Sequence, residues 1–369
     1  MKLAILGTRG IPNNHGGFEQ FAEYFSLYMA NKGHDISVFN SHTHPYQLKE
    51  WNGVKIIHKN DPEDKIGTAG QFIYDLNCIR HCRKEHFDII LQLGYTSSSI
   101  WSKLLPKNSI IITNMDGLEW KRSKYKKPVR KFLKIAESLA VKNSDYLVSD
   151  SIGIQNYIKK VYNKESKYIA YGADVFNMPD KSVVEQYNVE PYKYNMLIAR
   201  LEPENNIETI LDGVSLAKQK EIILVIGKHD TSKFGSHLKN KYQNQENIKF
   251  VGGVYNMNHL NNLRYYSKFY FHGHSVGGTN PSLLEAMASG ALIVANDNIF
   301  NKSILKLNAL YFKEPKNISN IIDDNSFFEK NKEAFKNNNI KEIKLNFNWN
   351  LINSQYENYL FSKLKGNNG

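Results

Sequence analysis

The sequence predicts an α/β protein made of two doubly wound halves, and three observations carry this prediction. Short runs of β-branched and aliphatic residues alternate with stretches long enough for amphipathic helices, which is typical of parallel sheets covered by helices. The alternation loosens around residues 174–192 and then starts again. The chain has 369 residues, enough for about two domains of ~150 residues each.

Buried strands are predicted in both halves, with helix-length segments between most of them. In the first half they are Leu3–Leu6, Ile36–Phe39, Val54–His58, Phe87–Leu91, Ile110–Thr113 and Tyr146–Ser149. In the second half they are Met196–Ala199, Ile222–Ile226, Ile248–Val251, Phe269–Phe271 and Ala291–Ala295. We therefore expect two Rossmann-like domains that face one cleft with the carboxyl ends of their strands.

The domain boundaries follow from this pattern. We expect a first domain over residues 1–174, a second over residues 192–345, and a C-terminal helix over residues 346–369. Within that last segment, apolar residues from Leu351 to Leu364 recur at helical spacing. The Asn- and Lys-rich stretch Asn317–Lys344 is expected to be exposed helix and loop.

Composition excludes several classes of protein. With 41% hydrophobic and 23% charged residues, the chain is neither disordered nor a coiled coil. No apolar run reaches the ~18 residues of a membrane span. Met1–Gly7 is predicted to be a first strand rather than a signal peptide. Two cysteines cannot form a disulfide framework, so we expect a cytoplasmic protein.

The net charge of +12, from 48 basic and 36 acidic residues, is concentrated in one segment. This basic run has no acidic residue and consists of Lys121, Arg122, Lys124, Lys126, Lys127, Arg130, Lys131 and Lys134. Such a density attracts nucleic acid, an anionic membrane surface or substrate phosphates. The alternative is a solvated helix face, which is what charge runs usually are.

A glycine-rich turn follows the first predicted strand. Gly7 and Gly10 come directly after it, and Gly16 and Gly17 then open an amphipathic helix. Backbone N–H groups and the positive end of the helix dipole suit a phosphate at such a turn. The spacing differs from the G-x-G-x-x-G dinucleotide fingerprint. The alternative is a tight turn without a ligand.

Two further residues could contact a nucleotide in the second half. Pro281 stands where a helix can begin, so Glu285 is predicted in its first turns, pointing away from the core, where its oxygens suit a ribose diol. Arg200 ends the first strand of this half, and its guanidinium could hold a diphosphate in two contacts. The alternative for Glu285 is an acid that only complements the helix dipole. The alternative for Arg200 is a surface salt bridge with Glu202 or Glu204.

Five strings, spread over nearly the whole chain, carry a resemblance to a known family. They are GTRGIP (7–12), HGGFE (15–19), NMDGLEWKRSKY (114–125), ARLEPENN (199–206) and HSVGGTNPSLLEA (274–286). Together they resemble the retaining family-four GT-B glycosyltransferases and, more narrowly, bacterial capsule and O-antigen rhamnosyltransferases. The resemblance implies a GT-B fold whose C-terminal helix crosses back to the first, acceptor-binding domain, while the second domain binds a nucleotide-sugar.

The resemblance also implies residue roles on the donor side. Glu285 corresponds to the glutamate that binds the nucleotide ribose, Arg200 to the diphosphate arginine, and Gly16 and Gly17 to the loop that approaches the donor phosphate.

Two positions depart from the family pattern. The family's first glutamate is Gly277 here, and the usual lysine after the arginine is Asn205. We expect the amides of Gly277 and Gly278 or the side chain of Thr279 to contact the transferred sugar in place of that glutamate.

The acceptor side is expected around Asp116, just after the Ile110–Thr113 strand. A carboxylate there could orient the acceptor hydroxyl or stabilise positive charge on the anomeric carbon. Glu119 and Trp120 follow and are expected to line the acceptor pocket, with simple packing as the alternative for Trp120. The basic run comes next, and we expect it to meet a polyprenyl-diphosphate-linked saccharide and anionic lipid. Interleaved Tyr125, Val129, Phe132 and Leu133 are expected against the bilayer.

No metal or other cofactor is expected. Cys78, His81, Cys82 and His86 are predicted to share one helix, whereas zinc sites normally draw ligands from more than one element. Cys78 and Cys82 are expected to pack in the core.

The best interpretation is a retaining glycosyltransferase at the inner face of the plasma membrane that moves L-rhamnose from dTDP-rhamnose to a lipid-linked saccharide. One alternative is a GT-B enzyme that uses a UDP- or GDP-sugar, or a nucleotide-sugar epimerase. Another is a non-catalytic basic protein that binds membranes or nucleic acid, although no nucleic-acid motif is present and we expect no such partner.

Overall fold

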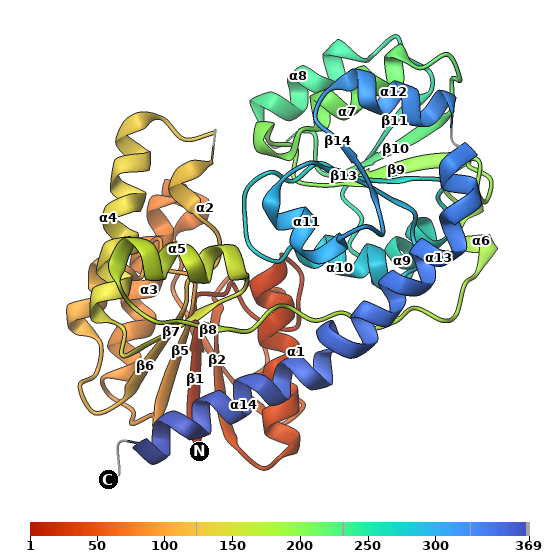
Figure 1. Cartoon of the computed structure of the whole chain (residues 1–369). Helices are drawn as coiled ribbons and strands as arrows, with labels where there is room; N and C mark the ends of the chain where they lie inside the picture. Colours follow the sequence, from red (N-terminus) through yellow and green to blue (C-terminus); the bar gives the residue numbers. More distant parts are fainter. Residues whose placement is uncertain (123, 231, 325, 367–369) are drawn as a thin grey trace. The chain divides into compact units, whose positions relative to one another are not determined.

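The computed structural model describes residues 1–122, 124–230, 232–324 and 326–366. The chain forms two compact units (Figure 1). Unit 1 comprises Met1–Lys121, Tyr125–Tyr171 and Trp349–Gly369, and unit 2 comprises Arg122–Lys124 and Gly172–Asn348. Each unit has a parallel sheet with helices on both faces, so the predicted fold class of two Rossmann-like domains is confirmed.

In the described part of unit 1, eight strands form one sheet in the order β3-β4-β2-β1-β5-β6-β7-β8. β3 pairs antiparallel with β4, whereas the neighbours of β1 are parallel to it. All six predicted strands are present, and two strands of two residues each, β3 and β8, were not predicted. The bounds are β1 Lys2–Leu6, β2 Asp35–Ser41, β3 Glu50–Trp51, β4 Val54–Lys59, β5 Ile89–Leu93, β6 Ile110–Asn114, β7 Tyr146–Ser149 and β8 Lys167–Tyr168.

The helices of unit 1 begin and end where local chemistry favours it. Ser151 caps α5 by accepting a hydrogen bond from the N–H of Ile154, and Pro128 lies in the first turn of α4. The bounds are α1 Gly17–Asn31, α2 Glu63–Ile66, α3 Ala69–Cys82, α4 Lys127–Asn143, α5 Ile152–Tyr162 and α14 Trp349–Gly366, with 3₁₀ turns at Ser99–Leu104 and Glu119–Lys121.

The sheet of unit 2, over its described residues, has six strands in the order β11-β10-β9-β12-β13-β14. The five predicted strands are present, and β14 was not predicted. The strands are β9 Tyr194–Ile198, β10 Ile222–Ile226, β11 Ile248–Gly252, β12 Tyr270–His272, β13 Ile293–Asn296 and β14 Leu310–Phe312. The helices are α6 Lys181–Glu185, α7 Ile207–Leu216, α8 Lys233–Lys241, α9 Met257–Tyr265, α10 Pro281–Ala288, α11 Ile299–Leu305, α12 Pro315–Asp323 and α13 Ser326–Glu342, and a π-helical turn follows at Ile343–Phe347.

The strand order creates a switch point in each sheet. In unit 1 the strands that follow β1 are added on one side of it as far as β4, and β5 then begins on its other side. The switch point of unit 1 thus lies between β1 and β5, and that of unit 2 lies between β9 and β12. Ligands of doubly wound folds bind outside the carboxyl ends of the strands at such points. The glycine turn after β1, Arg200 after β9 and the 273–280 loop after β12 therefore lie at the expected binding positions of their own sheets.

The predicted C-terminal helix is α14, and it packs within unit 1. In Figure 1, α14 lies beside α1, and the Tyr356 ring lies 4.6 Å from that of Phe21 and 5.4 Å from that of Phe25. Asn114 Nδ2 donates a hydrogen bond of 3.0 Å to Tyr356 Oη at the end of β6. Residues 367–369 of the predicted segment lie outside the described residues. In the described part of the chain, no helix is both long and apolar enough to cross a membrane.

Replacing Tyr356 tests the contribution of α14 to unit 1. Tyr356→Ala is expected to lower the free energy of unfolding by about 3–5 kcal/mol, because a ring with 1% exposure is removed from the core. Tyr356→Phe is expected to lower it by about 1 kcal/mol through loss of the Asn114 hydrogen bond. Urea unfolding measures both. Exposed Asn358→Ala is the control, and equal losses in all three variants would contradict the assignment.

Candidate functional site

The turn after β1 requires glycine at two positions. Gly7 has φ +85°, and a β-carbon there would lie 2.1 Å from the carbonyl oxygen of Leu93 at the end of β5. Gly10 has φ +131°, and a β-carbon would lie 2.4 Å from Cγ of Asn40 in β2. The turn therefore runs directly against the neighbouring strands, where any side chain would collide.

A buried acid holds this turn to the start of α1. Glu19 is 4% exposed, and its Oε1 accepts a hydrogen bond of 2.8 Å from the backbone N–H of Arg9. Gly16 is the N-cap residue and Gly17 the first residue of α1, as the sequence predicts, and no side chain of the described residues caps this helix end. The geometry presents backbone amides and the positive helix end at the carboxyl edge of the sheet.

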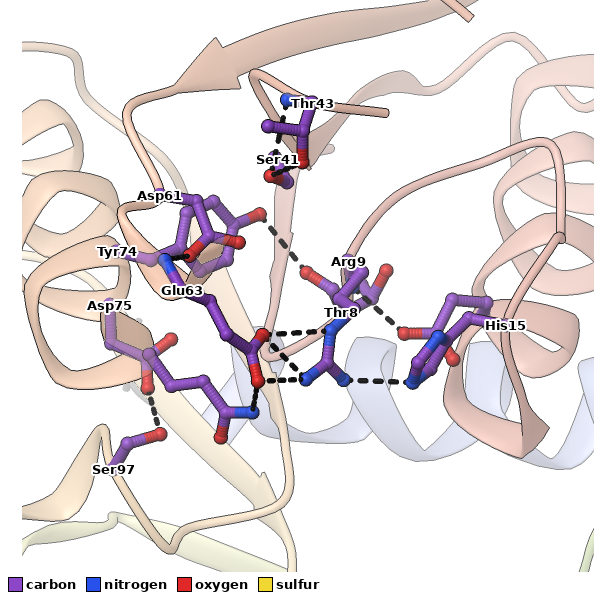
Figure 2. Close-up of polar contacts among 12 residues, drawn as sticks. Thr8, Arg9, His15, Ser41, Thr43, Asp61, Glu63, Tyr74, Asp75 and Ser97 are labelled. Atoms are coloured by element: carbon purple, nitrogen blue, oxygen red, sulfur yellow. Dashed lines mark hydrogen bonds and ion pairs between the residues drawn. The ribbon is translucent and has the colours of Figure 1, made fainter. Parts of the chain in front are cut away.

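A polar cluster lies beside the turn, and Figure 2 shows its contacts. The guanidinium of Arg9 binds the Glu63 carboxylate through Nη2, at 2.9 and 2.7 Å from its two oxygens, and through Nε at 3.2 Å. Arg9 Nη1 donates to His15 Nε2 at 2.9 Å, and Gln71 Nε2 donates to Glu63 Oε1 at 2.8 Å. The charge of Arg9 is thus matched within unit 1. The sequence did not predict this cluster, because Arg9 and Glu63 lie 54 positions apart.

Asp75 of α3 is the buried acid of this region, at 7% exposure. Burial raises the pKa of Asp75 to about 7; Asp61 adds to the rise, whereas the Ser97 hydrogen bond and Arg9 oppose it. Ser97 Oγ donates to Asp75 Oδ2 at 2.5 Å (Figure 2). Asp75 therefore changes protonation near neutral pH, in contrast to an ordinary aspartate.

The residues predicted on the acceptor side follow β6. Asp116 has φ +42°, and its N–H donates a 3.0 Å hydrogen bond to Asn114 Oδ1. Glu119 and Trp120 form the 3₁₀ turn that comes next. Trp120 Nε1 donates to Oε2 of Glu137 in α4 at 3.0 Å, so its indole is anchored on that helix.

Helix α4 divides the basic run, and the expectation that Leu133 lies against the bilayer is wrong. Leu133 is 5% exposed and belongs to the core, and the ring of half-buried Phe132 lies 5.7 Å from that of Phe72. Lys134 Nζ donates to Glu137 Oε1 at 2.7 Å and lies 4.8 Å from the centre of the Trp120 ring, with its side chain 38% exposed. The exposed basic residues are Lys121, Lys126, Lys127 and Lys131, while Arg122, Lys124 and Arg130 are half-buried.

Arg122 and Lys124 belong to unit 2 by their contacts. Arg122 lies 3.7 Å from Glu204, and Lys124 lies 3.7 Å from Glu202. Ser123 between them lies outside the described residues.

Arg200 follows β9, as predicted, and is exposed. Glu202 and Glu204 lie within ion-pair distance of Lys124 and Arg122, respectively. Asn205, the predicted donor contact, is 5% exposed, and its Nδ2 donates at 2.7 Å to the carbonyl oxygen of Arg200. Burial together with Arg200 and Arg122 lowers the pKa of His274 to about 3, so this histidine is neutral.

The loop after β12 depends on two glycines for different reasons. A β-carbon at Gly273 would lie 2.0 Å from the carbonyl oxygen of Asn205, so packing excludes one. Gly277 has no atom within 4 Å of such a carbon, but its φ of +136° is one that L side chains rarely adopt. Thr279 is 3% exposed. Asn280 caps α10 by accepting from the N–H of Ser282 at 2.9 Å, so the helix begins at Pro281 as predicted.

Glu285 lies in the second turn of α10 and is partly exposed. Its Oε2 lies 2.5 Å from Nη2 of Arg264 in α9, and the two side chains are 13% and 1% exposed. The sequence did not predict Arg264. The sequence also did not predict the contact between His272 at the end of β12 and His274 in the loop after it, whose rings stack at 4.5 Å between centroids.

Among the described residues, no group of three or more His, Cys, Asp or Glu residues could hold a metal ion. Cys78 and Cys82 are both buried in the core of unit 1, as expected. His86 lies beyond the end of α3 at Cys82, so the expectation that it shares that helix is wrong.

The protonation of Asp75 gives a pH-dependent prediction. Since burial raises its pKa from 3.8 to about 7, the folded state binds more protons than the unfolded state between these values, and stability falls as pH rises through this window. The free energy of unfolding of Asp75→Asn, relative to that of the wild type, should therefore increase from pH 4 to pH 7 and stay constant above pH 7. Urea unfolding along this range measures the difference. Asp64→Asn, an exposed neighbour in α2, is the control, and a pH-independent difference would contradict the shift.

Comparisons with known proteins agree with this architecture. Residues 1–174 match a domain of unknown function, DUF1972, and residues 181–344 match glycosyl transferases group 1. Among curated proteins, the sequence has no match. Sucrose-phosphate synthase from Thermosynechococcus elongatus superposes with a TM-score of 0.78 at 15% identity, covering 99% of both chains.

Two further solved structures are similar over almost the whole chain. HepE from Anabaena in complex with UDP has a TM-score of 0.74 at 14% identity and covers 98% of this chain and 100% of its own. A glycosyltransferase from Rickettsia africae has a TM-score of 0.73 at 14% identity and covers 99% of both chains. The chain therefore has the GT-B fold, and its residues 181–344 match the model of the glycosyl transferases group 1 family.

Proposed function

We propose that this protein is a retaining glycosyltransferase that moves L-rhamnose from dTDP-rhamnose to a lipid-linked saccharide during assembly of a capsule or O-antigen. The observation that carries the proposal is the pairing of an exposed Arg200 with a fixed Glu285 at the switch point of the group 1 domain. A guanidinium and a carboxylate at this position match the two ends of a nucleoside diphosphate. HepE, of the same fold, binds UDP and UDP-glucose.

On the donor side, Arg200 contacts the diphosphate and Glu285 accepts a hydrogen bond from the 3′-hydroxyl of the deoxyribose. The amides at Gly16 and Gly17, at the positive end of α1, are suited to a phosphate. Neutral His274 beside Arg200 adds no charge but offers a donor or acceptor to the sugar or phosphate. No divalent ion is needed in this scheme, since the guanidinium and helix ends stabilise the negative charge of the leaving diphosphate.

The sugar subsite is formed by the loop with Gly277, Gly278 and Thr279. Backbone N–H groups recognise hydroxyl oxygens without adding a carboxylate. L-rhamnose lacks a 6-hydroxyl, so a loop with fewer acceptors suits a deoxyhexose.

Transfer with retention requires the acceptor hydroxyl to approach on the face that the diphosphate leaves. The diphosphate itself takes the acceptor proton, which explains why no pair of carboxylates with glycosidase spacing is needed. Asp116 orients the acceptor hydroxyl or stabilises charge at the anomeric carbon. Glu119 and Trp120 line the acceptor pocket, with Trp120 anchored by Glu137.

A UDP-sugar donor is the second candidate, and the chemistry of Glu285 gives it specific support. UDP presents a 2′,3′-diol to a carboxylate, whereas dTDP presents a 3′-hydroxyl alone. Sucrose-phosphate synthase and HepE share the fold, and HepE is known with UDP-glucose.

Donor identity is tested by incubating the protein with dTDP-rhamnose, UDP-glucose or GDP-mannose and a polyprenyl-diphosphate-linked saccharide, followed by mass and linkage analysis of the product. We expect a rhamnosyl product that keeps the anomeric configuration of the donor. Arg200→Ala should weaken diphosphate binding by about tenfold or more, because charge-assisted contacts are lost, and exposed Arg80→Ala in α3 should leave it unchanged. Transfer from UDP-glucose alone would establish the second candidate, and epimerisation or the absence of any product would refute the transferase.

We further propose that the exposed part of the basic run attaches the protein to the inner face of the plasma membrane. Lys126, Lys127 and Lys131 are exposed on the first turns of α4, and Val129 beside them is 41% exposed. Each lysine near an anionic surface contributes about 1 kcal/mol. The membrane also carries the lipid-linked acceptor.

Vesicle co-sedimentation tests this attachment. Replacing Lys126, Lys127 and Lys131 by Glu should reduce binding to vesicles of phosphatidylglycerol and phosphatidylethanolamine by about a hundredfold or more at low salt. The control replaces the exposed lysines Lys316, Lys330 and Lys341 with the same change in net charge. Equal losses in both variants, or tighter salt-sensitive binding to DNA than to vesicles, would refute a membrane site on α4.

A further inference from the structure

A buried arginine lies beneath the acid that we assign to the donor ribose. Arg264 of α9 has a side chain that is 1% exposed, and its Nη2 lies 2.5 Å from Oε2 of Glu285. On the other side, Arg264 Nη1 donates to Asn261 Oδ1 at 3.0 Å. The guanidinium is therefore held by its own helix while it binds the acid of α10.

The two helices are also joined around this pair. Ser289 Oγ donates to Asn261 Oδ1 at 3.4 Å, and the backbone N–H of Ser289 donates to the Glu285 carbonyl at 2.9 Å. Tyr270 connects the sheet to α10, since its hydroxyl in β12 lies 2.6 Å from Ser282 Oγ at the start of that helix. The Glu285 carboxylate is thus bound by the Arg264 side chain of α9, in a region where α9, α10 and β12 are joined by hydrogen bonds.

Stability does not account for a guanidinium in this place. Removing an ion pair from water costs free energy that the mutual attraction often fails to recover, and apolar replacements of similar volume are often neutral or stabilising. In addition, Nε of Arg264 has no hydrogen-bond partner among the described residues. A buried guanidinium with an unsatisfied N–H does not improve the packing of this region. We therefore attribute the presence of Arg264 to its effect on Glu285.

That effect is positional and electrostatic. An ionised carboxylate accepts about four hydrogen bonds, so the bond from Arg264 at Oε2 is compatible with bonds from ribose hydroxyls. The guanidinium holds one rotamer of the acid, which removes the entropy cost of ordering the side chain when a nucleotide binds. Glu285, at 13% side-chain exposure, is the member of the pair nearer to solvent.

We infer that Arg264 is a positioning residue, which presents the Glu285 carboxylate to the ribose hydroxyls of a nucleoside diphosphate. This inference rests on the proposed function, because it assigns Glu285 to the nucleotide. Arg264 itself does not touch the ligand and acts through the acid.

A double-mutant cycle with the full-length protein tests the inference. The affinities of UDP and dTDP are measured by calorimetry for the wild type, Arg264→Met, Glu285→Gln and the double variant. We expect Arg264→Met to weaken binding about tenfold in the wild type and less than twofold when Glu285 is already Gln. Glu285→Gln is used because deletion of the whole side chain would leave Arg264 buried without a partner.

A second arm separates positioning from structural damage. The 2′,3′-dideoxy analogue of UDP lacks the hydroxyls that Glu285 would bind, so its affinity should not change in Arg264→Met. Arg264→Lys keeps the charge and should recover part of the loss for UDP, and Arg80→Met, which removes an exposed guanidinium of α3, should change nothing. Thermal unfolding reports the folded fraction of every variant.

The outcomes are distinct. Equal losses from Arg264→Met in both backgrounds, or for UDP and its dideoxy analogue alike, would overturn the positioning role and leave the proposed function standing. A folded wild type that binds neither nucleotide would overturn both.

Discussion

Close approach of backbone to backbone at the carboxyl edge of each sheet is the constraint on which this molecule depends. A β-carbon at Gly7 would lie 2.1 Å from the Leu93 carbonyl oxygen, and one at Gly273 would lie 2.0 Å from that of Asn205. Glycine is the residue that leaves these positions without a side chain. Because the strands and turns meet so closely, the segments that follow β1, β9 and β12 leave each sheet at its switch point, where ligands of this architecture bind.

The fold was largely predictable because its main signal is local. Buried parallel strands appear as short apolar runs, and the positions of all eleven predicted strands agree with the structure. The strands that were missed, β3, β8 and β14, have two or three residues each. A strand this short has no pattern of its own and forms because a neighbouring strand offers hydrogen-bonding groups, which the sequence does not reveal.

The candidate site was predictable only as far as its local motifs. Asn280 and Pro281 determine where α10 begins, and that placed Glu285 in the helix correctly. Its partner Arg264 is 21 positions away on another helix, and no periodicity connects the two. The same limit applies to Arg9 and Glu63. The charges in α4 were counted as one basic surface. The helical repeat of 3.6 residues, however, places Lys134 on the same side of the helix as Glu137, and the two form an ion pair.

The backbone at Gly277 has a consequence for the residues that this loop can accept. Its φ of +136° is strained for any residue with a side chain, at a cost of order 1–3 kcal/mol, although open space surrounds the position. A glutamate introduced there alone would meet no obstacle from its neighbours and would still reshape the loop that carries it. A carboxylate at this position therefore requires a change in the backbone of the 273–280 segment in addition to the substitution.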